Sequence, residues 1–413
     1  MASIKTIEGK TGASYRVYFR DPSGVQKSRN FKDEDEANEF KQEVEVDLRR
    51  SQYRDPSAGQ ETFKKFAEEW RSNRIVSPST REIERCHLER HVYPEIGNVR
   101  LAALTPTKLQ TLVKKLEQTP ARPARTPGRT KAGLPITLLK PKTIDGIMGT
   151  VKQVLNAAVA DDLITKNPMA NRAVRLPKIE QRKVKPWTPE EVAAVRDGMP
   201  ERYGIVVTLG SGLGLRQGEI FGLAVEDIDW LGGFVNVRRQ LKLDKQSRAY
   251  FGLPKGDKTR EVPLPTHVQM ALAAHIAAYE PVECSIPWAD PNGLTMATAN
   301  LLITTENGLP VRRDQFNKRA LKPAVESAGL VPNRDNMTHA LRHFYASVLL
   351  DANESVHTVA ANLGHSTPMI TLRTYAHLMP GSAARTRKAM DTVFDRVFKA
   401  DVASPLPNTA SGN

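Results

Sequence analysis

Two arginines in the C-terminal half of the chain each lie three residues from a second ionisable side chain. Arg216 precedes Glu219 in GLRQGE, and Arg342 follows His339 in THALRH. On a helix this spacing places both members of a pair on one face, so the Glu219 carboxylate can orient the Arg216 guanidinium or a neighbouring donor. A histidine and an arginine side by side repel each other when both are charged, unless an anion lies between them. The second pair therefore suits a bound anion.

A turn lysine is the next candidate. Lys255 and Lys258 fall in FGLPKGDKTREVPLP, after a strand expected at residues 234–243 and before the extended EVPLP. We therefore expect these lysines in or near a β-turn that reaches out from a sheet.

A histidine and a tyrosine follow near the C-terminus. We expect Ser355 to cap a short helix and Gly364 to end it, so that His365 emerges at the break. Ser366-Thr367-Pro368 then opens another helix, with Tyr375 two turns in. We also expect Thr338 to cap the helix of His339 and Arg342, whose opposite face carries Leu341, Phe344, Val348 and Leu349.

Each of these features has an ordinary structural explanation. An Arg–Glu pair at this spacing is often a surface salt bridge, and a lysine in a turn often serves only solubility. A single histidine near a helix start is commonly a cap or a core residue, and a single tyrosine commonly packs. Only their order and spacing together are specific.

As an ordered set, these residues resemble the tyrosine recombinase (phage integrase) family. The set lies in the contexts GLGLRQGEI, HALRHF, LGH and TYAH, and it comprises Arg216, Lys255, His339, Arg342, His365 and Tyr375. The resemblance covers the catalytic domain, residues 186–398. Residues 60–177 resemble the family's core-binding domain more loosely, and residues 1–55 resemble the arm-binding domains of larger integrases in layout and size.

The resemblance implies a role for each residue. Arg216 and Arg342 would bind the non-bridging oxygens of a DNA phosphate, for which the planar fork of arginine is suited. Tyr375 would attack the phosphorus; since the reference pKa of tyrosine is about 10, the phenol needs assistance at neutral pH. His339 is the candidate for proton transfer and His365 for a hydrogen bond to the phosphate. Lys255, with Lys258 as the alternative, would protonate the leaving 5′-oxygen. Glu219 would support the site.

This scheme requires no metal ion, no ATP and no other cofactor, because the arginines stabilise the charge and the phosphotyrosyl ester conserves the bond energy. The resemblance further implies a homotetramer on two double-stranded DNA attachment sites, of core and arm type. We also expect DNA-bending and directionality (excisionase-like) accessory proteins. The rivals are a type IB topoisomerase, which has a related site, and a catalytically silent DNA-binding regulator on the same scaffold.

Bulk composition agrees with a DNA partner. The 413 residues carry a formal net charge of +14 with 40% apolar residues. Such a basic protein commonly meets a polyanion, although a basic surface can also serve solubility alone. The two cysteines, Cys86 and Cys284, offer neither a disulfide framework nor a zinc cluster. With no signal peptide and no apolar run long enough for a membrane span, we expect a cytoplasmic or nucleoid-associated protein of a bacterial host.

The N-terminal unit is expected to hold a β-hairpin and a helix. Tyr15, Val17 and Phe19 alternate with polar side chains in a strand that ends at a DPSG turn, and residues 25–31 return as its partner. Residues 33–50 then form a helix. Arg16 and Arg20 are candidates for contact with a major groove, or else belong to a solvated face.

Two further basic segments could lie along DNA or simply be exposed surface. The loop between the third and fourth helices of the core-binding block carries Arg122, Arg125, Arg129, Lys131, Lys140 and Lys142. The linker at residues 178–185 contributes Arg182 and Lys183. After the linker, Thr188-Pro189 with Glu191 predicts a capping box at the start of the catalytic domain.

These patterns predict a multidomain α+β protein. We expect helices at residues 63–73, 78–90, 106–117 and 144–161 in an all-α core-binding domain, and a mainly α catalytic domain with a small antiparallel sheet. Residues 399–413 read as a disordered tail, and Val393, Phe394, Val397 and Phe398 just before it would dock on a neighbouring protomer or pack in their own subunit.

Overall fold

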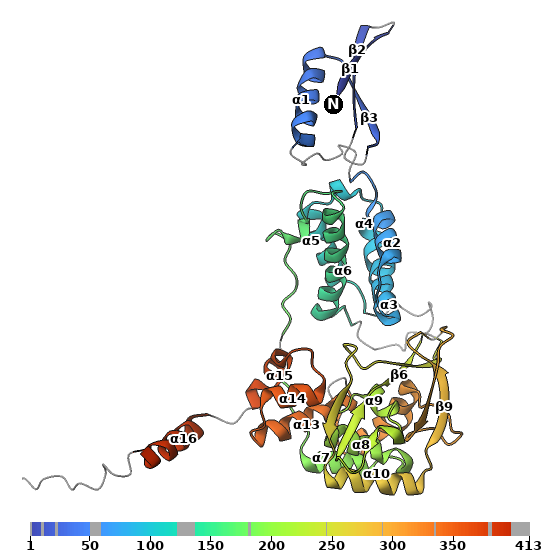
Figure 1. Ribbon diagram of the computed structural model, residues 1–413, viewed down its shortest axis with the longest axis vertical. Coiled ribbons are helices and arrows are strands. Elements are labelled where there is room, and N and C mark those ends of the chain that lie inside the picture. The colour runs from blue at the N-terminus through green and yellow to red at the C-terminus, as the bar shows by residue number, and fades with distance from the viewer. Residues whose placement is uncertain are drawn as a thin grey trace, which may run out of the picture. The chain divides into compact units, whose positions relative to one another are not determined.

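The computed structural model describes residues 2–9, 12–20, 24–49, 59–121, 137–180, 183–244, 246–290, 292–333, 336–378 and 382–397. The chain divides into two compact units, residues 1–180 and 181–413 (Figure 1). Two separate hydrophobic cores lie in the first unit, one built by residues up to 48 and one by residues from 63 onwards. Within the described ranges, no helix is long and apolar enough to cross a membrane.

The N-terminal part is a three-stranded antiparallel sheet followed by a helix. Its elements are β1 (Ser3–Gly9), β2 (Gly12–Arg20), β3 (Gln26–Phe31) and α1 (Glu34–Arg49), with β2 in the centre of the sheet. Val17 and Phe19 of β2 are buried with Ala37 and Val44 of α1, so the predicted alternation is correct. The prediction missed β1, because its apolar residues Ile4 and Ile7 stand three apart and hide the two-residue period of a strand.

The helical block follows the predicted helices closely. It contains α2 (Phe63–Asn73), α3 (Pro78–His87), α4 (Tyr93–Ile96), α5 (Pro106–Glu117) and α6 (Pro141–Ala160). The second predicted helix does not end at Arg90: a π-helical turn at Leu88–Val92 joins α3 to α4 without a break. Its buried Leu88 and Val92 face the same core as α6, which explains why the chain stays helical there.

The second unit contains the remaining helices. They are α7 (Pro189–Asp197), α8 (Glu201–Leu213), α9 (Gln217–Phe221), α10 (Thr266–Ala278), α11 (Arg313–Phe316), α12 (Lys322–Ser327), α13 (Thr338–Asp351), α14 (Val356–Leu363), α15 (Pro368–Tyr375) and α16 (Ser382–Val397). The predicted capping box of Thr188 and Glu191 opens α7, Ser355 caps α14, and Gly364 ends α14 in the left-handed region at φ 61°.

Small antiparallel sheets accompany these helices, as predicted for a multidomain α+β fold. The strands are β4 (Ile228–Asp229), β5 (Phe234–Val237), β6 (Gln240–Leu243), β7 (Ala249–Gly252), β8 (Arg260–Pro263), β9 (Val282–Pro287) and β10 (Met296–Leu301), paired as β4-β5-β8, β6-β7 and β9-β10. The single strand expected at residues 234–243 is two strands, broken at Arg238 and Arg239. Both arginines bind the buried Asp227, which draws them out of a ladder.

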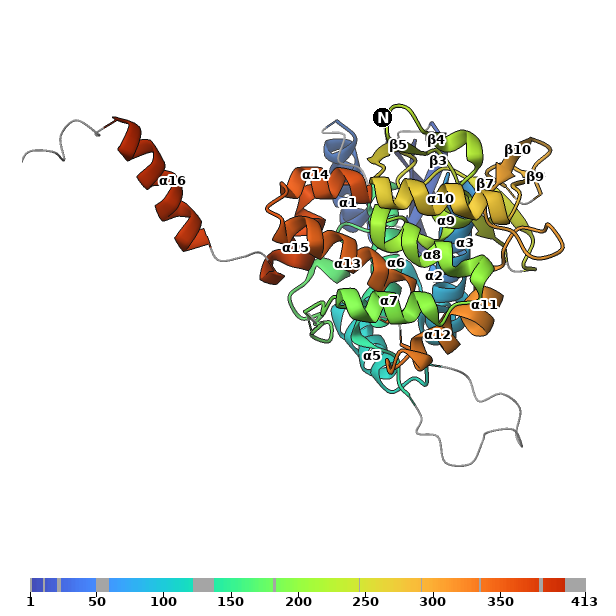
Figure 2. The same ribbon diagram turned by 90° about the horizontal axis from the view of Figure 1, so that it is seen from below.

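The centre of this unit is the contact between α8 and α13, which lie side by side in Figures 1 and 2. The approach is close because α8 presents Gly210 there: a Cβ on that residue would come within 2.8 Å of the Leu341 side chain. The helix pair α14 and α15 packs on the end of α13 through a smaller apolar cluster that includes Tyr345, Leu363 and Tyr375. Helix α13 therefore connects the main core to the segment that carries the tyrosine.

Candidate active site

Arg216 lies at the junction between α8 and α9. Helix α8 ends at Gly214, whose φ of 63° is left-handed. The sequence suggested that Arg216 lies inside a helix, but it is the N-cap of α9. Glu219 closes the turn. One carboxylate oxygen accepts from the Arg216 backbone N–H at 2.9 Å, and the other accepts from the Arg216 Nη1 at 2.9 Å. The predicted pairing of Arg216 with Glu219 is therefore confirmed.

Arg260, which the sequence reasoning did not single out, is the second partner of Glu219. It begins β8 and donates from both terminal nitrogens to the two carboxylate oxygens, at 3.1 and 2.7 Å. Its Nε donates to the backbone carbonyl of Asn362 at 2.7 Å. Alternation in β8 was an available signal, because Arg260 stands two residues from the buried Val262 and so shares its inward face.

Arg342 completes the group that we call the arginine cluster, namely Arg216, Arg260 and Arg342 around Glu219. It lies on α13, is only 5% exposed, and donates to the carbonyl of Gly214 at 2.6 Å and to that of Leu363. The prediction that Thr338 caps this helix is wrong. Met337 occupies the N-cap without a side-chain hydrogen bond, and Thr338 is buried as the first helical residue.

The predicted apolar face of α13 is also partly wrong. Val348 is 47% exposed, whereas Ala340, Tyr345, Ala346 and Leu350 are buried. The reason is that α13 packs on two sides, against α8 and against α14, so its buried residues do not follow a single stripe.

The C-terminal end of α14 contacts all three arginines. Its consecutive carbonyls Asn362, Leu363 and Gly364 accept from Arg260, Arg342 and Arg216, respectively, the last at 2.9 Å. The last carbonyls of a helix have no partner within the helix and carry partial negative charge, so this end suits cations. The helix terminus therefore holds three guanidiniums together although the chain supplies them from three distant segments.

Electrostatics in the arginine cluster favour an incoming anion. Burial alone would raise the pKa of Glu219, but hydrogen bonds and charge from Arg260, followed by Arg216, outweigh it and hold the pKa at about 2. Burial lowers the pKa of Arg342 to about 9, with Arg216 acting in the same direction, so that Arg342 is still charged at neutral pH. Three guanidiniums thus share one carboxylate, which leaves the cluster with excess positive charge.

The hydrogen bonds also separate the arginines by availability. A guanidinium has five N–H groups. Within the described residues, the protein accepts from two of them on Arg216 and on Arg342, but from three on Arg260. Arg216 and Arg342 therefore retain more donors for a ligand, and Arg260 serves mainly to position Glu219 and the end of α14.

His365 follows the break at Gly364. Its Nδ1 lies 2.8 Å from the Thr371 hydroxyl, and Thr371 is fully buried on α15. Burial, followed by the charges of Arg342, Arg216 and Arg260, lowers the pKa of His365 to about 4. His365 is therefore neutral and adjacent to the arginine cluster.

Tyr375 is the last residue of α15 and is 2% exposed. Burial raises its pKa to about 12, and the charge of Arg342 opposes that rise. The Tyr375 hydroxyl lies 2.7 Å from Nδ1 of His343, a contact that the sequence reasoning missed. A signal was present, since His343 directly follows Arg342 in LRH and is one helical turn from His339.

Two predicted catalytic residues lie at the surface. His339 is exposed in the first turn of α13, and Lys255 is exposed in the turn between β7 and β8. That turn is as predicted, and it contains Gly256 at φ 90° and Asp257 at φ 55°. The structure thus brings Arg216, Glu219, Arg342, His365 and Tyr375 together, and both His339 and Lys255 are exposed.

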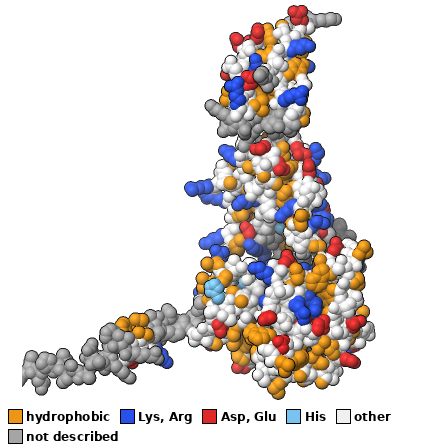
Figure 3. Space-filling model, in the orientation of Figure 1, with side chains coloured by type: hydrophobic (Ala, Val, Ile, Leu, Met, Phe, Trp, Pro, Cys, Tyr) orange, Lys and Arg blue, Asp and Glu red, His pale blue; other side chains and the backbone are white. Residues whose placement is uncertain are grey.

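The predicted DNA-binding residues are spread over both units, and Lys and Arg side chains are frequent on the face shown in Figure 3. Arg16 contacts the Asn30 side chain at 2.5 Å and Arg20 the Gly24 carbonyl at 3.0 Å, both on the sheet face opposite Val17 and Phe19. Lys140 and Lys183 are exposed, and Lys142 pairs with Asp145 at 2.8 Å. The others lie outside the described residues: Arg122, Arg125, Arg129, Lys131 and Arg182.

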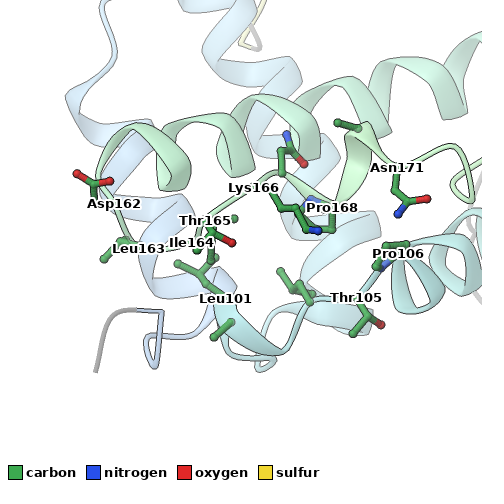
Figure 4. Close-up of a pocket in the computed structure, with 14 residues that line it drawn as sticks. Leu101, Thr105, Pro106, Asp162, Leu163, Ile164, Thr165, Lys166, Pro168 and Asn171 are labelled. Atoms are coloured by element: carbon green, nitrogen blue, oxygen red, sulfur yellow. The ribbon is translucent and has the colours of Figure 1, made fainter. Parts of the chain in front are cut away.

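A pocket of about 570 Å³ lies in the helical block (Figure 4). Its lining includes Leu101 from a 3-10 turn, Thr105 and Pro106 from the start of α5, and Ile164 and Lys166 from the segment after α6. It shares no residue with the arginine cluster. Over the described ranges, no three His, Cys, Asp or Glu side chains are grouped so as to hold a metal ion.

Two family models match parts of this chain. The phage integrase family matches residues 190–381, and the phage integrase N-terminal SAM-like domain matches residues 62–117. The two matches define the class of protein, a site-specific DNA recombinase. The chain belongs to the tyrosine recombinase (phage integrase) family, whose members carry out site-specific recombination.

Among similar sequences, a tyrosine recombinase XerC-like protein of Caldanaerobacter subterraneus is 28% identical over 61% of this chain and 66% of its own length. The putative prophage phiRv2 integrase of Mycobacterium tuberculosis is 26% identical over 90% of this chain and 88% of its own. Among solved structures, the Tn1549 transposon integrase with transposon right end DNA has a TM-score of 0.65 at 20% identity, over 81% of this chain and 99% of that one. A lambda integrase tetramer bound to a Holliday junction has a TM-score of 0.54 at 14% identity, over 88% and 92%.

Proposed function

We propose that this chain cleaves and rejoins DNA through a 3′-phosphotyrosyl bond to Tyr375, with Arg216 and Arg342 binding the scissile phosphate. The observation that carries the proposal is the convergence of both arginines on the end of α14, beside Tyr375, from segments far apart in the sequence. Free N–H donors aimed at one region can stabilise the additional charge of a pentacoordinate phosphorus. The charge of Arg342 opposes the effect of burial on Tyr375 and so acts in favour of the phenolate.

The remaining residues complete a balanced reaction. The Tyr375 Oη bonds to phosphorus while the bond from phosphorus to the 5′-oxygen breaks. Lys255 gives a proton to that oxygen, with Lys258 as the alternative, His339 takes part in proton transfer, and His365 donates a hydrogen bond to the phosphate. In the second step a 5′-hydroxyl of another strand attacks the phosphotyrosyl ester and releases Tyr375. The residues of this chain perform both steps without an external energy source.

The DNA partners are assigned domain by domain, as the family resemblance implies. The catalytic domain and the helical block, taken as residues 186–398 and 60–177, would hold a core site, with residues 178–185 as the linker. Residues 1–55 would hold a separate arm site through the polar face of the β1-β2-β3 sheet, where Arg16 and Arg20 lie. In this proposal four copies assemble on two sites in the bacterial cytoplasm and integrate or excise a mobile element, assisted by DNA-bending and directionality proteins.

The C-terminal helix supplies one further contact in the proposed assembly. On α16, Val393 is 52% and Phe394 47% exposed, so neither is packed in the core of its own subunit. Docking of these side chains on a neighbouring protomer would remove apolar surface from water. The predicted disordered tail at residues 399–413, together with Phe398, lies outside the described residues.

A suicide DNA substrate, nicked next to the crossover point so that the cleaved end is lost, tests the chemistry. The wild-type chain should form a covalent adduct visible on a denaturing gel, and Tyr375→Phe should form none. An adduct that persists in Tyr375→Phe contradicts the mechanism. Mixing two marked DNA sites then separates recombination, which gives a joint product, from topoisomerase-like relaxation, which gives none.

Deletion of residues 1–55 tests the arm site. The truncated chain should still cleave core DNA but should no longer bind a distant arm sequence in a gel-shift assay. A truncated protein that still bridges arm and core sequences would show that the sheet is not the arm-binding element.

A further inference from the structure

The hydroxyl of Tyr375 has a defined neighbour on α13. Nδ1 of His343 lies 2.7 Å from Oη, and the two rings meet edge-on, with centroids 5.6 Å apart and planes inclined by 64°. A heavy-atom distance of 2.7 Å is within direct hydrogen-bond reach, which is the first requirement for a group that takes a proton. His343 is half-buried on a helix that packs on both sides, so its position is set by rigid structure.

The backbone couples this contact to the phosphate-binding group. His343 is the residue directly after Arg342, whose guanidinium is fixed by the carbonyls of Gly214 and Leu363. Arg342 is also near enough to Tyr375 for its charge to act on the hydroxyl. Consecutive residues of α13 thus place an acceptor and a cation beside the same oxygen: the acceptor can remove the proton and the cation can stabilise the phenolate that remains.

From this geometry we propose that His343 is the catalytic base that removes the proton from Tyr375. The inference rests on the proposed function and refines it, because it names His343 rather than His339 as the group that takes the proton of the nucleophile. The tautomer required carries hydrogen on Nε2, so that Nδ1 accepts from the phenol. As the bond from Oη to phosphorus forms, the proton moves to Nδ1; on rejoining, Oη leaves phosphorus and recovers that proton.

A second role for the same contact predicts the opposite result. His343 could instead hold Tyr375 in its buried position until DNA draws it out, in which case the contact would restrain the reaction. Removing the imidazole would then leave cleavage unchanged or make it faster. Removing a base makes cleavage slower, typically by a factor of about 10² to 10⁴.

The experiment measures adduct formation on the suicide substrate at saturating DNA, in the full chain. His343→Ala removes the imidazole. His343→Asn places an amide oxygen near the position of Nδ1, so it can accept a hydrogen bond from Tyr375 but cannot take its proton. His357→Ala is the matched control, because His357 is exposed on α14 outside the site. Circular dichroism and gel-shift affinity establish that each variant is folded and binds DNA.

We expect both His343 variants to lose about 10² to 10⁴ in the cleavage rate while DNA affinity is retained, and His357→Ala to behave as wild type. A wild-type or faster rate in His343→Ala overturns the assignment in favour of a restraint. Recovery in His343→Asn overturns it in favour of hydrogen bonding alone. Both outcomes leave the wild-type adduct intact, whereas failure of the proposed function is the absence of that adduct or its persistence in Tyr375→Phe.

Discussion

Replacing Glu219 with glutamine tests how the arginine cluster is held together. Glutamine keeps the size of the side chain and one carbonyl oxygen for the Arg216 backbone N–H, but it removes the carboxylate that binds two of the three guanidiniums. The pKa of Glu219 falls from 4.5 to about 2 in the folded chain, and at about 1.4 kcal/mol per pKa unit this corresponds to about 3 kcal/mol of stability. We therefore expect Glu219→Gln to lose about 3 kcal/mol at pH 7.

Urea unfolding followed by tryptophan fluorescence measures this loss. In a Trp70→Phe background the remaining tryptophans, Trp187, Trp230 and Trp288, all lie in the unit that contains the site. The control is Glu226→Gln. Glu226 is 38% exposed and lies 3.5 Å from Arg239, so its loss should cost less than about 1 kcal/mol.

The pH dependence gives a second check with a defined sign. The pKa of Glu219 is depressed by folding, so its contribution is present above 4.5, the value in the unfolded chain, and is lost as pH falls towards about 2. The difference between wild type and Glu219→Gln should therefore shrink over that range, since other carboxylates titrate alike in both proteins. No difference at pH 7, or a difference that stays constant down to pH 2, would refute the reasoning.

Three further predictions concern the reaction itself. The Lys255→Ala variant should cleave ordinary DNA more slowly by a factor of about 10² to 10⁴. It should cleave a substrate with sulfur in place of the leaving 5′-oxygen almost normally, because a thiolate leaves without a proton. Lys258→Ala should cleave both substrates normally, and the reverse pattern would make Lys258 the acid. Arg342 and Tyr375 of one chain lie within electrostatic reach, so we expect the tyrosine to attack the phosphate bound by its own subunit. A mixture of the Arg216→Ala and Tyr375→Phe variants should then form no adduct. An adduct in the mixture would show that Tyr375 acts on a phosphate bound by another subunit. Gly364→Ala puts a Cβ on a left-handed residue, 3.0 Å from the Arg260 guanidinium, so the variant should lose about 1–2 kcal/mol of folding stability and also cleavage activity. Gly329 is also left-handed but has no neighbour within 4 Å, so Gly329→Ala should lose stability alone. Equal cleavage by the two variants would show that the end of α14 does not position the arginines.

Local chemistry made much of the fold predictable. The capping box of Thr188 and Glu191, the Ser355 cap and the left-handed Gly364 are decided by neighbours within four residues, and each is found where the sequence indicated. The pairing of Arg216 with Glu219 is local in the same sense. Predictions failed where another element intervened. Helix α13 packs on two sides, so its buried residues do not follow the single predicted stripe and Val348 is exposed. Asp227 draws Arg238 and Arg239 out of a continuous strand.

The sequence by itself determined most of the helices, although it left β1 unrecognised and merged β5 with β6, and it placed the ordered set from Arg216 to Tyr375 within one unit. Only the tertiary structure decided what those side chains contact. Arg260 reaches Glu219 across 41 residues, His343 reaches Tyr375 across 32, and the end of α14 reaches Arg216 across 148. Such contacts depend on how α8, α13 and α14 pack, and packing depends on the shapes of many side chains at once, which no spacing along the chain records.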